Sequence, residues 1–348
     1  METILFLAHT ETDGTLGRPA REALTAARQL AEAAAGAPFV IGLLGANTEP
    51  AAAQVAGAGA ARVLAATDER LAQPRYASDA LAAQALCQAA NATVVIAPAT
   101  ARFNRVLPGV SHRLGGAVDT HVSEIAPEGD GLQVVRWFYR QRLRGRLSRT
   151  ARPWILLVDP GCFPAWTGES GAAAAEAVSV AFDDQPLRTE VTGIKAPAED
   201  AQTIRPDADL LFVAGAGWTK QQADGQAHVP EAERLILDFL KLTRASLGSS
   251  KSLVEIGGEG QEVLSFLTHL NQIGQTGATP RHPKGLSTCC HGEEPHTVGW
   301  RFITERRAIN LDANCGWARG KADVLYVADA FAVMRRVNEL LAAEPAAE

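Results

Sequence analysis

The sequence lacks any apolar run of the length that a membrane-spanning helix needs, so we expect no insertion into a membrane. It also lacks an excess of positive charge. The 33 Lys and Arg residues are outnumbered by 39 Asp and Glu residues, and the net charge of −6 gives no support for nucleic acid binding. A Walker Gly-Lys-Ser/Thr motif and an obvious carboxylate pair for a metal are missing, which argues against a stand-alone nucleotide hydrolase.

Cysteine is scarce and irregularly spaced. The five cysteines are odd in number, and their spacing fits neither a disulfide framework nor a CxxC metal pair. A reducing compartment is the simplest interpretation. The first apolar segment, residues 4–8, begins almost at Met1 and leaves no room for a signal or transit peptide. We therefore expect a cytoplasmic protein.

The first part of the chain alternates short apolar runs with alanine-rich helical segments. Apolar residues make up 47% of the chain and charged residues 21%, which is enough for a sizeable core. The runs are almost wholly apolar, as expected for strands that helices cover on both faces. The alternation predicts an α/β fold with a doubly wound parallel sheet. We expect strands at residues 4–8, 39–44, 61–66 and 93–97, and helices at 20–35, 50–58, 78–90 and 105–114.

The pattern changes in the middle of the chain, where short turns join strand-like segments that would add antiparallel strands to the sheet. Seven arginines lie between residues 136 and 152, with Trp137, Phe138, Leu143 and Leu147 among them. This pattern favours a solvated strand face, or a contact with an acidic partner, over a phosphate or nucleic acid site. We expect strands at residues 120–125, 132–139, 153–157, 177–182 and 188–194.

A polar, proline-containing stretch at residues 196–209 marks a shift in composition. We place a domain boundary there, between an N-terminal α/β domain, residues 1–203, and a C-terminal domain, residues 204–348. The second domain opens with an apolar strand from residue 210 that leads into glycines, which indicates a Rossmann-like unit. Further strands are expected at residues 252–256, 307–311 and 324–327, and helices at 230–245, 261–271 and 330–341.

The most informative motif is the turn Gly274-Gln275-Thr276-Gly277. Its bare backbone N–H groups, one amide and one hydroxyl suit an anionic ligand that is rich in hydrogen-bonding groups. Asn310 and Asp312 follow at the end of a later strand, and an amide beside a carboxylate suits an adenine edge and a ribose. Together these features indicate one half of a dinucleotide cofactor site.

These motifs and others in the same order carry a family resemblance over nearly the whole length. The chain resembles the alpha subunit of an electron transfer flavoprotein. The resemblance rests on residues 97–100, 104–108, 115–120, 136, 139 and 160–164 in the first domain, and on residues 215–217, 250–251, 274–277, 285–287, 309–312 and 328–329 in the second.

The resemblance implies FAD in a C-terminal Rossmann-like FAD-binding domain and a heterodimer with a beta subunit that carries AMP or another flavin. The N-terminal domain would contact that beta subunit. Such a protein is an electron carrier rather than a bond-making enzyme. It takes electrons from a donor dehydrogenase and passes them to a quinone reductase or another acceptor.

The same resemblance assigns cofactor-binding roles to individual residues. Gln275 and Thr276 would bond the flavin ring and its phosphate chain. Lys251 replaces the arginine that is usual in the family, which keeps a positive charge but loses the planar guanidinium. The other predicted cofactor residues are Gly215 and Gly217, where the backbone would approach closely, Ser250 at the flavin, Gly274 and Gly277 in the turn, Gly285 and Ser287 at the ribityl or pyrophosphate, His291 at the flavin, and Asn310 and Asp329 at the adenosine.

The chain departs from the family pattern around this site. The segment between Gly277 and Gly285 is shorter than usual, His291 falls one residue early, and Leu311 stands where lysine is usual. One alternative is therefore a flavin-less nucleotide-fold subunit with a structural or regulatory role in a dehydrogenase complex. A zinc or iron site or a nucleophilic cysteine are further alternatives. The residues that raise these two alternatives are His282, Cys289, Cys290, His291 and His296.

Overall fold

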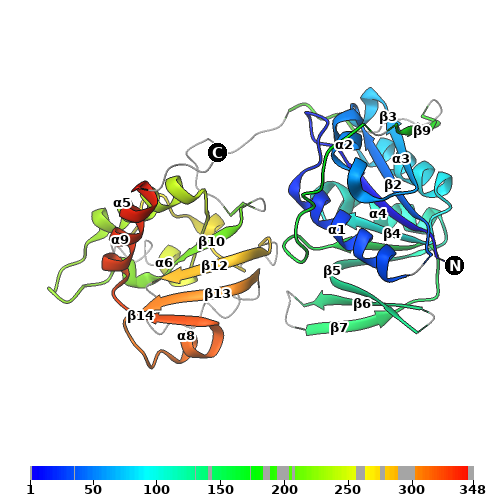
Figure 1. The fold of residues 1–348 in the computed structure, drawn as a ribbon. Helices are drawn as coiled ribbons and strands as arrows, with labels where there is room; N and C mark the ends of the chain where they lie inside the picture. Colours follow the sequence, from blue (N-terminus) through cyan, green and yellow to red (C-terminus); the bar gives the residue numbers. More distant parts are fainter. Residues whose placement is uncertain are drawn as a thin grey trace. The chain divides into compact units, whose positions relative to one another are not determined.

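The computed structural model describes residues 2–34, 36–129, 131–139, 143–172, 174–182, 189–193, 204–205, 208–255, 263–274, 279–288 and 302–343. The chain forms two compact units, Met1–Lys195 and Ala196–Glu348. Each unit has its own sheet and its own hydrophobic core (Figure 1).

The first unit is built on a nine-stranded sheet with the strand order β7-β6-β5-β8-β4-β1-β2-β3-β9. The pairs from β5 to β9 are parallel, whereas β6 pairs antiparallel with both β5 and β7. The predicted parallel sheet with added antiparallel strands is confirmed. The strands are β1 (Ile4–His9), β2 (Phe39–Gly45), β3 (Arg62–Thr67), β4 (Val94–Pro98), β5 (Ala117–Glu128), β6 (Gly131–Phe138), β7 (Leu143–Ser148), β8 (Trp154–Val158) and β9 (Glu176–Ala177).

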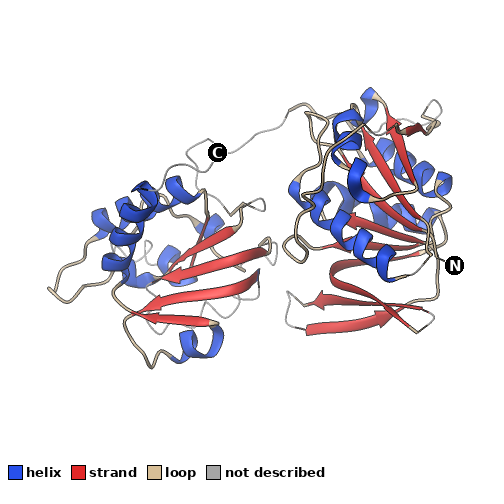
Figure 2. Cartoon of the chain, viewed as in Figure 1, coloured by secondary structure: helices blue, strands red, loops and turns tan. Residues whose placement is uncertain are grey.

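Helices cover both faces of the parallel part of this sheet (Figure 2). Side chains of β1 alternate between the two faces, because Ile4 and Phe6 join one buried cluster and Leu5 and Leu7 join the other. Every residue of β1 is buried, which is why residues 4–8 of the strand are continuously apolar. The helices are α1 (Arg18–Ala33), α2 (Glu49–Gln54), α3 (Tyr76–Ala89), α4 (Ala101–Arg113), and the 3-10 helices η1 (Ala56–Ala58) and η2 (Glu69–Leu71).

A buried carboxylate holds the antiparallel strands to the parallel part of the sheet. Asp119 of β5 is fully buried and accepts hydrogen bonds from Arg136, Arg149 and the indole of Trp154. Burial opposes ionisation, but the three donors together hold the pKa of Asp119 below its ordinary value. Two members of the arginine-rich stretch therefore have an internal structural role.

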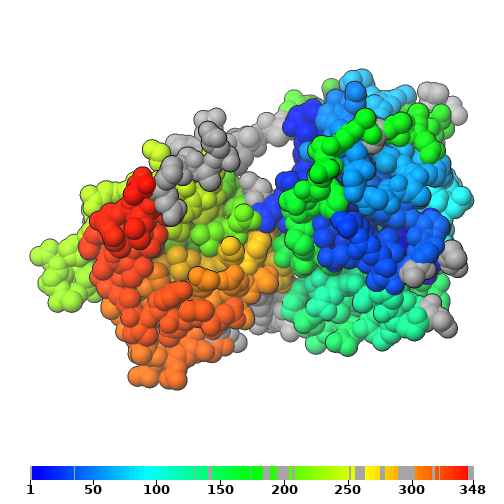
Figure 3. All heavy atoms as spheres, in the orientation of Figure 1, coloured from blue at the N-terminus to red at the C-terminus, as the bar shows by residue number. Residues whose placement is uncertain are grey.

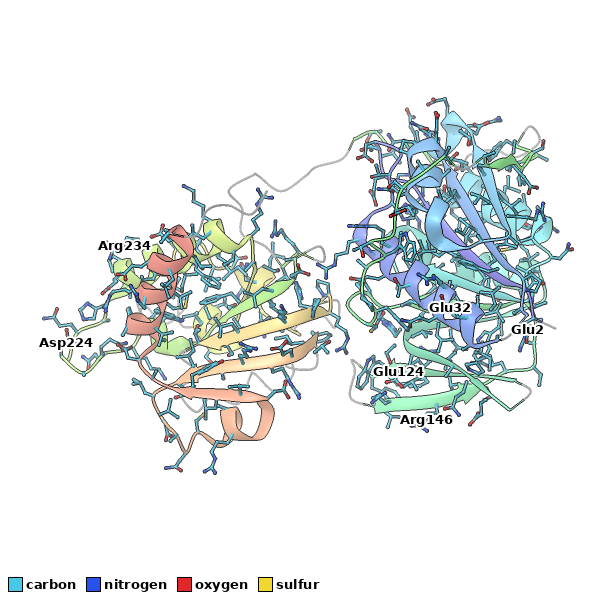
Figure 4. The ribbon with its side chains drawn as sticks, viewed as in Figure 1. Glu2, Glu32, Glu124, Arg146, Asp224 and Arg234 are labelled. Carbon is cyan, nitrogen blue, oxygen red and sulfur yellow. The ribbon has the colours of Figure 1, made fainter. Side chains whose placement is uncertain are left out.

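The outer strand of the β6–β7 hairpin carries Arg144 and Arg146 at the surface, whereas Arg152, which follows β7, is half-buried and pairs with Glu2. From Arg144 on, residues of β7 alternate between exposed and half-buried positions, so one strand face is exposed in this chain. Its contact with an acidic partner stays a prediction. Arg144 pairs with Glu124, and Arg146 is exposed (Figure 4). Arg140 and Arg142 lie outside the described residues.

The strands expected at residues 177–182 and 188–194 are largely absent. Only the two-residue strand β9 forms there, and the described residues 178–182 and 189–193 form no further strand. Val178, Val180 and Phe182 instead pack against the core of the unit as side chains. Their apolar spacing resembles a strand, although only β9 pairs with the edge strand β3.

The second unit has a five-stranded, fully parallel sheet with the strand order β11-β10-β12-β13-β14 (Figure 1). One face is covered by α5 and α9, and the other carries a smaller cluster that includes α8. The elements are β10 (Leu210–Ala214), η3 (Ala216–Thr219), α5 (Val229–Thr243), β11 (Ser246–Ser249), α6 (Lys251–Glu255), η5 (His269–Asn271), β12 (His282–Thr288), β13 (Ile303–Asn310), α8 (Gly316–Lys321), β14 (Val324–Val327) and α9 (Ala330–Ala343).

Two expectations for this unit are wrong. Residues 252–256 were expected as a strand, but helix α6 covers Lys251–Glu255 and the strand is β11, which comes just before it. The hydroxyl of Ser250 accepts a hydrogen bond from the Leu253 amide, which is the bond of a helix cap. In the described part of the helix expected at residues 261–271, only the single turn η5 is helical.

Candidate functional site at the carboxyl edge of the second sheet

The strand order of the second sheet defines one crevice. The chain passes from β10 to β11 on one side and then to β12 on the other side of β10. The connection that leaves β10 leads to β11, whereas the one that leaves β12 leads to β13 on the opposite side, so the two diverge at the carboxyl ends of β10 and β12. In open parallel sheets, ligands bind at such a switch point. The Gly215 amide donates to the Thr288 carbonyl over 2.9 Å there and ties the two strand ends together.

The turn after β10 is buried and held by side chains. Gly215 and Gly217 are both buried, and Gly217 lies in η3. The indole of Trp218, the next residue, donates to the Thr288 hydroxyl. The ring of Trp218 also packs 4.6 Å from that of Phe331, measured between centroids. The turn is therefore fixed, and the close approach of a cofactor to the two glycines stays a prediction.

Beside this turn lies the end of β11. The Ser250 amide donates to the Ala214 carbonyl over 2.9 Å, which places Ser250 next to the end of β10. Ser250 is buried and caps α6, and the backbone of Lys251 begins that helix. The Ser249 hydroxyl is buried and has no hydrogen-bond partner among the described residues.

Gly274 reaches the same edge from another segment. The Ile273 amide donates to the Ser249 carbonyl over 3.2 Å, so the segment that leads into Gly274 lies beside the end of β11. Gly274 has a φ of 76°, a conformation that favours glycine, and its amide donates to the Thr279 hydroxyl. The remaining turn residues, Gln275, Thr276 and Gly277, lie outside the described residues, as does His291.

The two predicted residues of β12 differ in position. Ser287 is buried one residue before the end of the strand, close to the switch point. Gly285 lies in mid-strand, paired with Leu211 and Arg306. A Cβ atom on Gly285 would lie 2.4 Å from Cδ1 of Ile303, so packing explains this glycine. A cofactor contact at Gly285 stays a prediction.

Asn310 and Asp329 lie at the ends of adjacent strands. The Ala328 amide donates to the Asn310 carbonyl over 3.1 Å. The side-chain Oδ1 of Asn310 accepts from the Asp312 amide, and Oδ1 of Asp329 accepts from the Phe331 amide. Both side chains therefore shape the turns that follow their strands. Asn310 is buried, whereas Asp329 is exposed.

A cavity of about 400 Å³ lies beside Asp329. In its wall, His228 Nε2 lies 2.8 Å from Asp224 Oδ2, in the projecting loop before α5 where Figure 4 labels Asp224. The Gln226 amide and His228 together lower the pKa of Asp224. These residues were not predicted from the sequence, because a polar loop between a strand and a helix gives no signal of its own. The lining also includes Gln222, Glu231, Leu311, Phe331 and Arg335.

Comparison with known proteins identifies the family of the chain through its first unit. The family model described as "Electron transfer flavoprotein domain" matches residues 4–185, which is more than half of the chain. The chain belongs to the electron transfer flavoprotein family.

Two relatives extend the match beyond the first unit. "Electron transfer flavoprotein subunit alpha" of Clostridium acetobutylicum is 25% identical over 340 residues, which cover 95% of this chain and 92% of the relative. "Protein FixB" of Clostridium saccharobutylicum is 25% identical over 308 residues, 87% of this chain and 85% of the relative. The low identity fits a divergent member of the electron transfer flavoprotein family.

In this chain of the electron transfer flavoprotein family, most of the predicted cofactor residues that the structure describes lie at the carboxyl edge of the second sheet. The structure brings together Gly215, Gly217, Ser250, the Lys251 backbone, Gly274, Ser287, Asn310 and Asp329. Thr288 and Trp218, which join β12 to the turn after β10 at the switch point, were not predicted as site residues. Their only signal was position, since Trp218 directly follows Gly217 and Thr288 directly follows Ser287.

Of the residues considered for a metal, only His282 is described. It is fully buried in β12, with its ring nitrogens 3.0 Å and 2.8 Å from the carbonyl oxygens of Pro280 and Arg205. No group of three His, Cys, Asp or Glu residues suited to a metal occurs in the described ranges. Cys289, Cys290 and His296 lie outside them. Within the same ranges, no helix has both the length and the apolar character to cross a membrane.

Proposed function

We propose that this chain is the alpha subunit of a heterodimeric electron transfer flavoprotein. It binds FAD at the carboxyl edge of the second sheet and pairs with a beta subunit. It carries electrons from a donor dehydrogenase to a quinone reductase or another acceptor. Family membership supports the proposal, as does the printed name of the C. acetobutylicum relative, which matches over nearly its whole length.

The switch point between β10 and β12 carries the assignment of the cofactor site. The buried turn at Gly215 and Gly217 and the positive-φ turn at Gly274 put backbone groups beside it. The glycines let a diphosphate approach the backbone closely, although the amides of Gly215 and Gly274 already donate to the Thr288 carbonyl and the Thr279 hydroxyl. The buried Ser249 hydroxyl adds a polar group that no described residue satisfies.

Each remaining residue has a proposed part in binding. Asn310 and Asp329, at the far end of the same edge, suit the adenosine half. Ser250 and Ser287 suit the flavin half. Lys251 would place a positive charge near the ring and favour its reduced, negatively charged form. The bound flavin supplies the redox chemistry, while the chain holds it and excludes water.

A second candidate is the flavin-less subunit. Oδ1 of both Asn310 and Asp329 is already used by a backbone amide of the chain itself, which favours a structural role for these residues. Such a subunit would keep the fold and the partner interface without holding FAD.

The experiment is to co-purify the heterodimer and to quantify the FAD it releases on denaturation. Because the beta subunit can carry its own flavin, wild-type protein is compared with Gly217→Val, which adds bulk in the buried turn. Gly193→Val is the matched control, since nothing lies within 4 Å of a Cβ there. A selective loss of FAD in Gly217→Val supports the carrier. A folded heterodimer with equal FAD in all three proteins, or with none, supports the flavin-less subunit.

A further inference from the structure

An apolar groove lies on the face of the second sheet that α9 only partly covers. Its volume is about 660 Å³, within the range of sites for small organic ligands. In the space-filling view, the red surface of α9 borders the orange surface of β13 and β14 (Figure 3). We call this space the α9 groove. Its apolar lining includes Leu210, Leu286, Ile309, Tyr326, Val333 and Val337.

The groove exists because the larger side chains of α9 pack into the core and do not lie over this part of the sheet. Phe331 and Met334 are buried in the core that α9 shares with α5. Val333 and Val337, one helical turn apart, are the residues that α9 presents to the groove. Their short side chains leave the space above β13 and β14 unfilled. Tyr326 of β14 stays 43% exposed as a result.

One end of the groove carries charge. Lys284, Glu305 and Arg307 line it, and Arg307 Nη2 lies 2.7 Å from Glu305 Oε1. The bond from Glu305, with help from Tyr326, raises the pKa of Arg307. The Lys284 side chain is exposed and makes no hydrogen bond or ion pair with another described residue, while its backbone amide donates to the Asp209 carbonyl. The groove therefore combines apolar walls with a net positive charge at this end, two cations against the one carboxylate of Glu305.

The groove is separate from the proposed cofactor site. Side chains of a strand alternate between its two faces. Leu286 and Ile309 point to the groove face, so their neighbours Ser287 and Asn310 belong to the opposite face. Among the described residues predicted to bind the cofactor, Gly285 alone lines the groove, so a ligand there does not contact Ser287 or Asn310, and the inference does not depend on FAD.

We propose that the α9 groove binds an amphipathic monoanion, a carboxylate with a linear apolar chain. The chain lies along the leucine, isoleucine and valine walls, where burial of apolar surface stabilises it. The carboxylate lies at Lys284, which supplies the opposite charge. A cation of the same chain length lacks this partner, so the groove discriminates by charge.

The test is isothermal titration of the purified heterodimer with dodecanoate below its micelle concentration, and with dodecyltrimethylammonium as the charge-reversed probe. We expect one saturable site per heterodimer for dodecanoate and affinity weaker by about tenfold for the cation. Lys284→Glu should reverse this preference. Lys241→Glu, an exposed lysine of α5 outside the groove, should leave it unchanged.

A second pair of variants tests the apolar walls. Val333→Phe should fill the groove and abolish dodecanoate binding, whereas Leu340→Phe, on an exposed part of α9 outside the lining, should not. Absence of saturable binding to the wild type would overturn the proposal, as would equal affinity for both probes or equal effects of the two lysine variants. Binding to the isolated chain but not to the heterodimer would also overturn it, because the partner then covers the groove.

Discussion

The indole nitrogen of Trp218 donates a hydrogen bond of 2.7 Å to the hydroxyl of Thr288, and both side chains are fully buried. The same hydroxyl donates to the Val213 carbonyl over 3.2 Å. Thr288 therefore fixes the end of β10 from one side and the following turn from the other. Thr288 ends β12, and β12 and β10 flank the switch point. This one hydroxyl therefore keeps the backbone of the proposed cofactor turn in place.

Replacing Thr288 with valine removes this hydroxyl at nearly constant volume. The Trp218 indole then has no partner, which should lower the free energy of unfolding by about 1–3 kcal/mol. The turn at Gly215 loses its anchor, so the heterodimer should also release FAD faster. Thermal unfolding and flavin release under dialysis measure the two effects. Thr243→Val, which removes a hydroxyl at the end of α5, is the control and should change stability without changing FAD release.

The buried carboxylate of the first unit gives a second prediction. Asp119→Asn removes the charge that Arg136 and Arg149 share. The unfolding free energy should fall by about 3 kcal/mol, at the low end for a broken buried ion pair because Arg149 is 41% exposed. Urea denaturation followed by circular dichroism measures this loss. Glu124→Gln breaks an exposed pair on the same hairpin and should cost far less. Similar losses in both variants would contradict the structural role of Asp119.

The sequence predicts an element well where one physical signal dominates. Residues 324–327 form the expected strand and residues 4–8 lie within β1, because both are short, apolar and set off by turns. The strand β11 was missed because its four residues, Ser-Leu-Gly-Ser, are small and half polar, although all are buried. The next residues look like a strand, but the Ser250 cap makes them a helix. Apolar composition alone does not reveal a cap or a buried serine.

The candidate cofactor site could be predicted only in part, because some of its residues are defined by contacts with distant parts of the chain. Sequence motifs marked Gly215, Ser250 and Asn310, and parallel strands bring their ends to one edge. Gly285 was chosen from a motif, yet the structure explains it by the side chain of Ile303. Thr288 was missed because its partner, Trp218, lies 70 residues away in the chain. Contacts between distant residues leave no local pattern.

A third prediction concerns the potential of the flavin. Lys251 follows Ser250 at the end of β11. Lys251→Ala should lower the flavin potential by tens of millivolts with FAD still bound, because a nearby positive charge favours the reduced, negatively charged ring, and about 59 mV corresponds to 1.4 kcal/mol for one electron. Redox titration of the heterodimer, monitored in the visible range, measures the change. Lys241→Ala on α5 is the control. An unchanged potential in Lys251→Ala would remove the charge argument.

The last prediction concerns acid sensitivity at the end of β1. His9 is buried, with Nε2 3.0 Å from the Thr100 hydroxyl. Burial, with help from Arg102, lowers the pKa of His9 to about 4. Because the unfolded chain takes up this proton near pH 6.5, stability should be full above that pH and fall by about 1.4 kcal/mol per pH unit down to about pH 4. In His9→Gln this component should vanish, so the stability difference between wild type and variant should change with pH across this window. Urea denaturation at intervals between pH 4 and 7 measures it. A difference that is constant with pH would mean that His9 is not held neutral in the folded protein.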